Sequence, residues 1–179
     1  MDFDEVVERF IRATTAVADE YFLLKVAGGG GPVWRERVYC YELYHQLRIN
    51  WGDKLMLAAE VDKRSHPLPH FRIDELRDVK PDFIVHDAGH EHDDVAVIEV
   101  KRAISKSQKI TDDYLTLMNF CHRARYKGGI MLFFGINRRL STKAARALDA
   151  ARENAGFVCD KPLVTLHHAA PGQPAVRIP

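Results

Sequence analysis

The sequence predicts an α/β fold of three layers, α/β/α, with a central mixed sheet. Two observations predict it. The expected elements follow the order α–α–β–β–β–α–β–α–β, and a three-strand meander joined to a further strand by a crossover helix builds a mixed sheet with helices on both sides. Residues 130–134 are continuously apolar, which is typical of a strand buried on both faces.

Hydrophobic periodicity predicts the helices. Apolar residues recur at helical spacing from residue 3 to residue 26, and the glycine run that ends at Pro32 stops that pattern. We interpret this run as a flexible connector and not as a phosphate-binding loop, because no Gly-Lys-Ser or Gly-Lys-Thr follows it. Ser141 is a suitable N-cap for the last helix, and Gly156 fits its C-terminal turn. The expected helices cover residues 3–26, 34–51, 106–125 and 141–154.

Short apolar runs predict the strands. A polar turn rich in glycine and aspartate joins the runs 82–86 and 95–100, as expected for antiparallel neighbours. Residues 63–79 are polar and contain two prolines, so we expect a loop there. The expected strands cover residues 55–61, 82–86, 95–100, 130–134 and 163–166.

Composition is that of one soluble domain: 179 residues, of which 46% are hydrophobic and 28% charged. No apolar run approaches the ~20 residues that span a bilayer, and the acidic N-terminus lacks the charge pattern of a signal peptide. We therefore expect no membrane partner and a cytoplasmic location. The expected parts of the domain are an N-terminal helix (1–27), a Gly-rich connector (28–33), the core (34–168) and a tail (169–179) that is either irregular or an addition at the edge of the sheet.

The three cysteines, Cys40, Cys121 and Cys159, are widely spaced and form no CxxC pair. This pattern favours reduced, buried or half-buried thiols over a disulfide framework or a zinc ribbon. Three histidines near the turn, His86, His90 and His92, could suggest zinc, but they lack a complete ligand spacing, so a plain polar turn is preferred.

The residues with the clearest chemical meaning are Asp82, Glu99 and Lys101. Side chains two apart on a strand share a face, so Glu99 and Lys101 project together. Asp82 begins the preceding apolar run and joins them if the two runs pair as neighbouring strands. Two carboxylates beside one ammonium are costly to assemble unless something binds there, and Mg²⁺ with a phosphate suits oxygen ligands best.

This pattern, Pro81-Asp82 followed by Glu99 and Lys101, resembles the PD-(D/E)XK nuclease superfamily, which has the restriction-endonuclease-like fold. The resemblance covers roughly residues 34–168, and residues 34–135 reproduce the core order αβββαβ. A Glu-x-Lys triplet alone has little value, because a chain this charged contains about one by chance. Its position at a strand end, one strand after Pro81-Asp82, gives it meaning.

Phosphodiester hydrolysis needs an activated water, a Lewis acid and stabilisation of the leaving group, which Mg²⁺ or Mn²⁺ can supply or assist. Asp82 and Glu99 would be the carboxylate ligands, with the Val100 carbonyl as a further ligand. Lys101 would orient the water and stabilise the developing charge, because nearby carboxylates raise the pKa of a lysine and disfavour a role as base. The resemblance implies the same roles.

The resemblance also implies that a glutamate from the helix before the sheet joins the site, and Glu42 is the candidate. Glu60, near the end of the first strand, is the second candidate. For each of them a solvent-facing carboxylate is the alternative.

Net charge is only +1, so nucleic-acid binding depends on local basic clusters. The candidates for contact with nucleic acid are Arg102, Lys106, Gln108 and Lys109, for which solvated surface residues are the alternative. The Gln-x-x-x-Tyr spacing of several nuclease families is not matched, because Gln108 and Tyr114 are six apart.

The sequence therefore predicts a Mg²⁺- or Mn²⁺-dependent nuclease, acting on DNA in preference to RNA, with defence or repair as roles suggested by fold analogy. Its small size favours non-specific or structure-directed cleavage, or action as a homodimer or with a protein partner. The alternative is a catalytically inactive module of the same fold that binds nucleic acid or protein.

Overall fold

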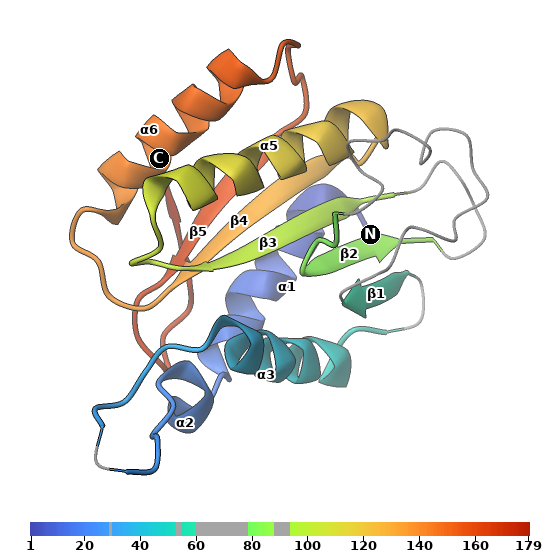
Figure 1. Ribbon diagram of the computed structural model, residues 1–179. Coiled ribbons are helices and arrows are strands. Elements are labelled where there is room, and N and C mark those ends of the chain that lie inside the picture. The colour runs from blue at the N-terminus through green and yellow to red at the C-terminus, as the bar shows by residue number, and fades with distance from the viewer. Residues whose placement is uncertain (29, 53–54, 60–78, 88–93) are drawn as a thin grey trace.

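The computed structural model describes residues 1–28, 30–52, 55–59, 79–87 and 94–179. Figure 1 shows these residues folded as one sheet with helices on both sides. The helices are α1 (Phe3–Thr15), α2 (Asp19–Phe22), α3 (Glu36–Ile49), α5 (Ser107–Arg123) and α6 (Leu140–Asn154). The strands are β1 (Met56–Ala59), β2 (Phe83–His86), β3 (Ala96–Arg102), β4 (Gly128–Phe134), β5 (Leu163–His168) and β6 (Val176–Ile178).

The six strands form one mixed sheet in the order β1-β2-β3-β4-β5-β6. The first three form an antiparallel meander, β3, β4 and β5 are parallel to one another, and β6 returns antiparallel. The core order αβββαβ is confirmed by α3, the three meander strands, α5 and β4. The crossover helix α5 connects the parallel strands β3 and β4, as parallel pairing requires.

Two hydrophobic cores, one on each face of the sheet, confirm the three-layer α/β/α fold. One core joins α1, α2 and α3 to sheet residues such as Phe83, Ile98 and Val100. The other joins α5 and α6 to Ile84, Val97 and their neighbours on the opposite face. Every residue of β4 is buried, as its continuous apolar run predicts.

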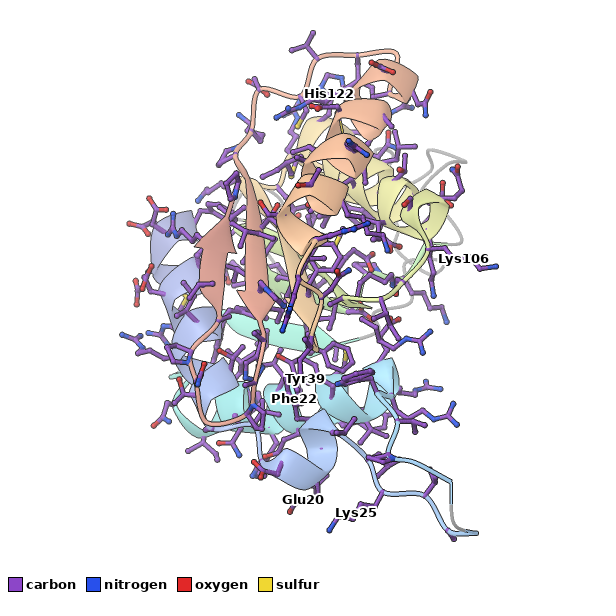
Figure 2. All side chains as sticks on the ribbon, turned by 90° about the vertical axis from the view of Figure 1, so that its left-hand side faces the viewer. Glu20, Phe22, Lys25, Tyr39, Lys106 and His122 are labelled. Carbon is purple, nitrogen blue, oxygen red and sulfur yellow. The ribbon has the colours of Figure 1, made fainter. Side chains whose placement is uncertain are left out.

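The expected helix over residues 3–26 is wrong in its length, because α1 ends at Thr15 and a separate turn of helix, α2, follows. The break lets Phe22 turn inward. Its ring makes edge contacts with Tyr39 and Phe134, and the rings of those two residues stack at 4.1 Å. Figure 2 shows Phe22 and Tyr39 side by side where α2 meets α3. Burial of these aromatic rings overrides local helix propensity.

The Gly-rich connector is closed at its base. Leu24 and Val33 form an antiparallel bridge with backbone hydrogen bonds of 3.0 and 2.9 Å. The bridge thus closes the base of the connection between α2 and α3, and Val33, the last residue of the expected connector, belongs to that base.

The N-cap predicted at Ser141 is wrong. Arg139 occupies that position without a side-chain cap, and Ser141 lies inside α6. Asn137 supplies the preceding turn instead, since its Oδ1 accepts the backbone N–H of Arg139 at 3.0 Å. Gly156 has a positive φ of 68° just beyond the end of α6, which confirms its predicted place in the C-terminal turn.

Of the two expectations for the tail, the edge addition is confirmed, because the tail contains β6, which pairs with β5 through Thr165, Leu166 and His167. The backbone N–H of Ala175 donates to the buried Thr14 Oγ1 at 2.8 Å. The tail is thus fixed both to the sheet edge and to the C-terminal end of α1.

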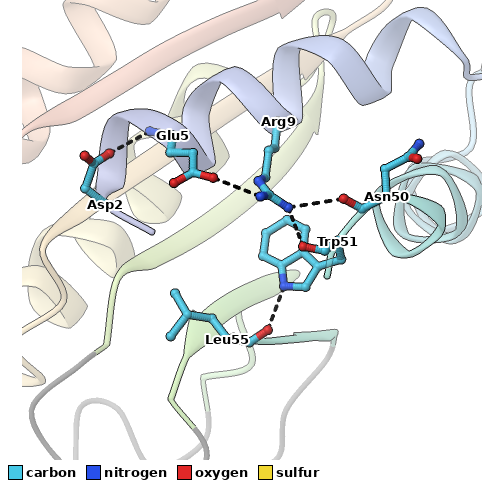
Figure 3. A network of polar contacts seen from close by, with 6 residues as sticks. All are labelled: Asp2, Glu5, Arg9, Asn50, Trp51 and Leu55. Atoms are coloured by element: carbon cyan, nitrogen blue, oxygen red, sulfur yellow. Dashed lines mark hydrogen bonds and ion pairs between the residues drawn. The ribbon is translucent and has the colours of Figure 1, made fainter. Parts of the chain in front are cut away.

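Arg9 joins α1 to the end of α3 (Figure 3). Its guanidinium donates to the backbone carbonyls of Asn50 and Trp51, pairs with Glu5 at 2.9 Å and lies 5.4 Å from the centroid of the Trp51 ring. The Trp51 indole donates in turn to the carbonyl of Leu55 at 2.7 Å. This network joins α1 to the end of α3 and to Leu55, the residue before β1.

Among the described residues, no helix combines the length and the apolar character that crossing a bilayer requires.

Candidate functional site

Strand pairing brings Asp82 to Glu99, as the sequence predicts. Phe83 of β2 lies opposite Ile98 of β3, and continuing this antiparallel register by one residue places Asp82 opposite Glu99. Asp82 Oδ2 accepts the backbone N–H of Val100 at 2.7 Å, and the Asp82 and Glu99 side chains share a hydrogen bond. A hydrogen bond between two carboxyl groups requires a proton, so these acids do not both ionise freely.

Lys101 lies between the two helical layers. Its Nζ is 3.2 Å from Glu36 Oε1 of α3 and 3.3 Å from Asp113 Oδ2 of α5. The two helices begin near the end of β3, so their first turns and the end of that strand meet on one side of the molecule (Figure 1). Lys101 is only 4% exposed, and a buried ammonium requires such partners.

Four acidic side chains therefore act on one ammonium, Glu36 and Asp113 by direct contact and Glu99 and Asp82 from nearby, which leaves surplus negative charge in a largely buried site. Burial, together with the charges of Asp82 and Asp113, raises the pKa of Glu99 well above its usual value. Burial also raises the pKa of Asp82, against the stabilising Val100 N–H and Lys101, and raises that of Asp113 to about 6. The hydrogen bond between the two acids raises the pKa of Glu99 and lowers that of Asp82.

Lys101 is a stable ammonium in this environment. Burial by itself lowers the pKa of Lys101, but attraction to Asp113, Glu36, Glu99 and Asp82 outweighs burial and raises it. Charge stabilisation and orientation of a ligand are therefore within its reach, whereas proton abstraction near neutral pH is not.

The glutamate that reaches this cluster from α3 is Glu36 and not the expected Glu42. Glu42 instead accepts a hydrogen bond from Gln46, one turn further along the same helix, at 2.6 Å. The two glutamates are six residues apart, which is about 240° around a helix, so they face different directions. Glu60 lies outside the described residues, as do His90 and His92.

The other predicted residues surround the cluster without entering it. Arg102 ends β3 and is exposed, and Lys106 and Lys109 are exposed at the start of α5. Lys106 projects away from the ribbon in Figure 2. Gln108 donates to Asp112 on its own helix at 2.8 Å. These side chains form a basic margin next to the acids.

Sequence reasoning missed Glu36 and Asp113, although the helix pattern contained a signal for both. Glu36 is four residues before the buried Cys40 and seven before the buried Leu43, and Asp113 is four residues before the buried Leu117. Acidic residues at these spacings lie on the buried side of their helices.

The loop after Lys101 is fixed by side chains from the segment that follows β4. Asn137 Nδ2 donates to the carbonyl of Ala103 at 2.7 Å, and Lys143 Nζ donates to the carbonyl of Ser105. These bonds hold the start of α5, and with it Asp113, at the end of β3.

The donor set suits a hard divalent cation with a small number of protein ligands. Within the part of the chain that the structure describes, no three His, Cys, Asp or Glu side chains form a ready-made metal cage. Mg²⁺ does not require one, because it commonly uses one or two carboxylates and keeps several waters. Asp82 and Glu99, which lie opposite each other on neighbouring strands, could supply those carboxylates.

No protein-family model, no curated protein and no solved structure matches the chain. The functional argument therefore depends on the fold and on the geometry of this site.

Proposed function

We propose that this protein is a metal-dependent nuclease of the PD-(D/E)XK type that hydrolyses phosphodiester bonds in nucleic acid, with DNA as the preferred substrate. The observation that carries the proposal is the convergence of Asp82, Glu99 and Lys101, with surplus negative charge around the lysine. Buried acids that are not neutralised by the protein are costly, and a cation that binds among them lowers that cost.

Asp82 and Glu99 would hold Mg²⁺ or Mn²⁺, and the Val100 carbonyl is a further candidate ligand. A bound ion of this kind supplies Lewis-acid polarisation of the phosphoryl oxygen and a lowered pKa of its bound water. Asp82 is fixed for this role by the N–H of Val100, so it needs little reorganisation when the ligand arrives.

Lys101 supplies positive charge where the phosphorane develops negative charge. Glu36 and Asp113 hold its ammonium from two sides and keep it protonated. It can therefore orient the attacking water and stabilise the transition state without giving up its proton.

The basic margin supplies contacts for the phosphates on either side of the cleaved bond. Arg102 follows Lys101, and Lys106 and Lys109 lie at the start of α5; all three basic side chains are exposed. Such contacts give affinity without sequence specificity and weaken as salt increases.

The test is cleavage of labelled single- and double-stranded DNA and of RNA with Mg²⁺, Mn²⁺ or EDTA. We expect metal-dependent cleavage by the wild type and a loss of at least about 100-fold in Lys101→Met and Glu99→Gln, as is usual when a preorganised electrostatic contact is removed. Glu153→Gln, on the exposed side of α6, is the matched control and should retain full activity.

Two results would refute the proposal. One is the absence of cleavage with either metal on every substrate, which would leave a binding module of the same fold. The other is cleavage that survives in both Lys101→Met and Glu99→Gln.

A further inference from the structure

Cys121 and Cys159 lie together on the face of the sheet opposite to α1 and α3. Cys121 is buried in the last turns of α5, and Cys159, half-buried, precedes β5. Both belong to the core between α5, α6 and the sheet, and their thiols share a hydrogen bond. The two cysteines are 38 positions apart along the chain. Leu163 connects them in space, because it lines a cavity together with Cys159 and also lies beside the Cys121 sulfur over Gly129.

The sheet leaves room for this pair at Gly129. A Cβ at that position would approach Leu163 Cδ2 to 2.7 Å and Cys121 Sγ to 3.5 Å. The missing side chain therefore lets Leu163 and the Cys121 thiol sit directly on β4, next to the segment that carries Cys159.

The pair is open to small molecules from one side. Cys159 lines a cavity of about 270 Å³ together with Met118, Phe157 and Lys161, and Arg152 also contributes to its wall. Small oxidants fit such a volume, whereas Cys121 itself is only 1% exposed. One thiol of the pair is thus accessible and the other is protected.

We propose that Cys121 and Cys159 form a peroxide-sensitive thiol pair, in which Cys159 is oxidised first and Cys121 then closes a disulfide. The thiolate of Cys159 attacks one peroxide oxygen, an S–O bond forms, the O–O bond breaks, and the leaving hydroxide takes a proton to become water. The Cys121 sulfur then attacks the sulfenic acid, an S–S bond forms, the S–O bond breaks, and the Cys121 proton leaves with the hydroxide as a second water. Two thiols lose two electrons and the peroxide gains them.

Electrostatics support this order of events. The hydrogen bond from Cys121, with the Lys161 backbone and the Lys161 charge, lowers the pKa of Cys159 to about 6, against burial and the charge of Asp160. The same hydrogen bond and burial raise the pKa of Cys121. The thiolate is the reactive form, so Cys159 is the nucleophile.

The first step is tested by the pH dependence of iodoacetamide alkylation of the full chain, followed by peptide mapping. We expect Cys159 to react with a midpoint near pH 6 and, at pH 7, a few-fold faster than in the same chain unfolded in urea, because a lower pKa also reduces nucleophilicity. A midpoint in the folded chain equal to that in the urea-unfolded chain overturns the proposal.

The second step is tested with hydrogen peroxide and non-reducing peptide mapping. We expect the wild type to form a Cys121–Cys159 cross-link while Cys40 stays reduced as the internal control. Cys121→Ser should accumulate Cys159 sulfenic acid that a dione reagent traps, and Cys159→Ser should leave Cys121 reduced. If the wild type is oxidised at Cys159 without a cross-link, or if Cys40 is oxidised first, the pair has no such role. The wild-type result alone decides this even where a variant folds poorly.

Discussion

Asp82 Oδ2 accepts the backbone N–H of Val100, with 2.7 Å between oxygen and nitrogen. Asp82 is the residue just before β2, so its side chain accepts a hydrogen bond from the backbone of β3 where β2 supplies no strand partner. A buried backbone N–H without a partner is costly, so this aspartate has a structural role as well as its proposed chemical one. This bond to the backbone of β3 holds Asp82 at its position opposite Glu99.

Asp82→Ala and Asp82→Asn should separate the two roles of this residue. The amide of asparagine can still accept the Val100 N–H, whereas alanine leaves that donor unpaired, which costs about 1–3 kcal/mol. We expect urea denaturation to show Asp82→Asn as the more stable variant by about 1 kcal/mol, and both to lose metal-dependent cleavage. Equal stability of the two variants would show that the hydrogen bond contributes nothing.

Lys101→Met should destabilise the protein most at alkaline pH. Without the ammonium, Glu36 and Asp113 lose their cation in a largely buried site, and we expect a loss of about 2–3 kcal/mol at pH 8. At pH 5.5 the loss should be smaller, because Asp113 is then mostly protonated. Lys106→Met, at the exposed start of α5, is the control and should change the free energy of unfolding by less than about 0.5 kcal/mol. A Lys101→Met variant as stable as the wild type at pH 8 would contradict the ion pairs.

Glu36→Gln and Glu42→Gln compare the glutamate that contacts Lys101 with the glutamate that does not. Removing the charge of Glu36 should reduce the cleavage rate by about 10–100-fold, as is usual when a group that orients a reacting side chain is lost. Glu42→Gln should stay within about twofold of the wild type, because surface substitutions away from a site have small effects. The measurement is single-turnover cleavage at saturating Mn²⁺, and the reverse order of the two variants would restore the sequence-based expectation.

The three catalytic candidates were predictable because strand geometry is simple. The alternation of side chains along a strand placed Glu99 and Lys101 on one face, opposite to Ile98 and Val100, and both aliphatic side chains do lie in the core on the other face. The turn between the two strands predicted antiparallel pairing, and this pairing alone brings Asp82 to Glu99.

The helical residues of the site were harder to predict because the phase of α3 is ambiguous. Tyr41 and Ile49 are apolar enough to suggest a buried side, yet they are 58% and 59% exposed, while Cys40 and Leu43 are buried. If Tyr41 faced the sheet, Glu42 would lie on the inner side of α3. Because Cys40 faces the sheet, Glu36 lies there instead. The spacing of Glu36 from Cys40 and Leu43 is thus one of two competing signals in the sequence, and packing against the sheet decides between them.

The end of the chain shows the same limit. His167 and His168 suggest a polar strand end, but His168 is fully buried, and its Nδ1 lies 2.9 Å from the Tyr39 hydroxyl. A buried histidine becomes acceptable because a residue 129 positions away provides its partner. Long-range pairing of this kind is not visible in local sequence patterns.

Asp113→Asn should change how stability depends on pH. The folded-state pKa of Asp113 is raised from 3.8 to about 6, so the folded state binds this proton more tightly than the unfolded state does. Its ionisation therefore costs stability as pH rises from about 4 to about 6, with a slope of at most about 1.4 kcal/mol per pH unit.

Asparagine does not ionise, so we expect Asp113→Asn to gain stability relative to the wild type across that window and to keep the gain at pH 7–8. Burial lowers the pKa of His168 to about 4, so protonation of this histidine in acid reduces the free energy of unfolding. This effect is common to both proteins and cancels in the difference between them. Urea denaturation at half-unit steps from pH 4.5 to 8 measures the difference, and parallel curves for the two proteins would rule out a raised pKa at Asp113.

Arg9→Met should weaken the link between α1 and the end of α3. The substitution keeps an unbranched side chain but removes donation to the carbonyls of Asn50 and Trp51 and the contact with the Trp51 ring. Hydrogen bonds from a charged donor contribute about 1.5–3 kcal/mol and an exposed cation–π contact about 0.5–1 kcal/mol. Because Arg9 is partly exposed, we expect a total loss of about 2 kcal/mol in urea denaturation, with faster amide exchange at the end of α3. Arg12→Met, an exposed residue of the same helix that lines a surface cavity together with Arg9, is the matched control and should lose less than about 0.5 kcal/mol. Equal losses in the two variants would mean that the network around Trp51 does not hold the two helices together.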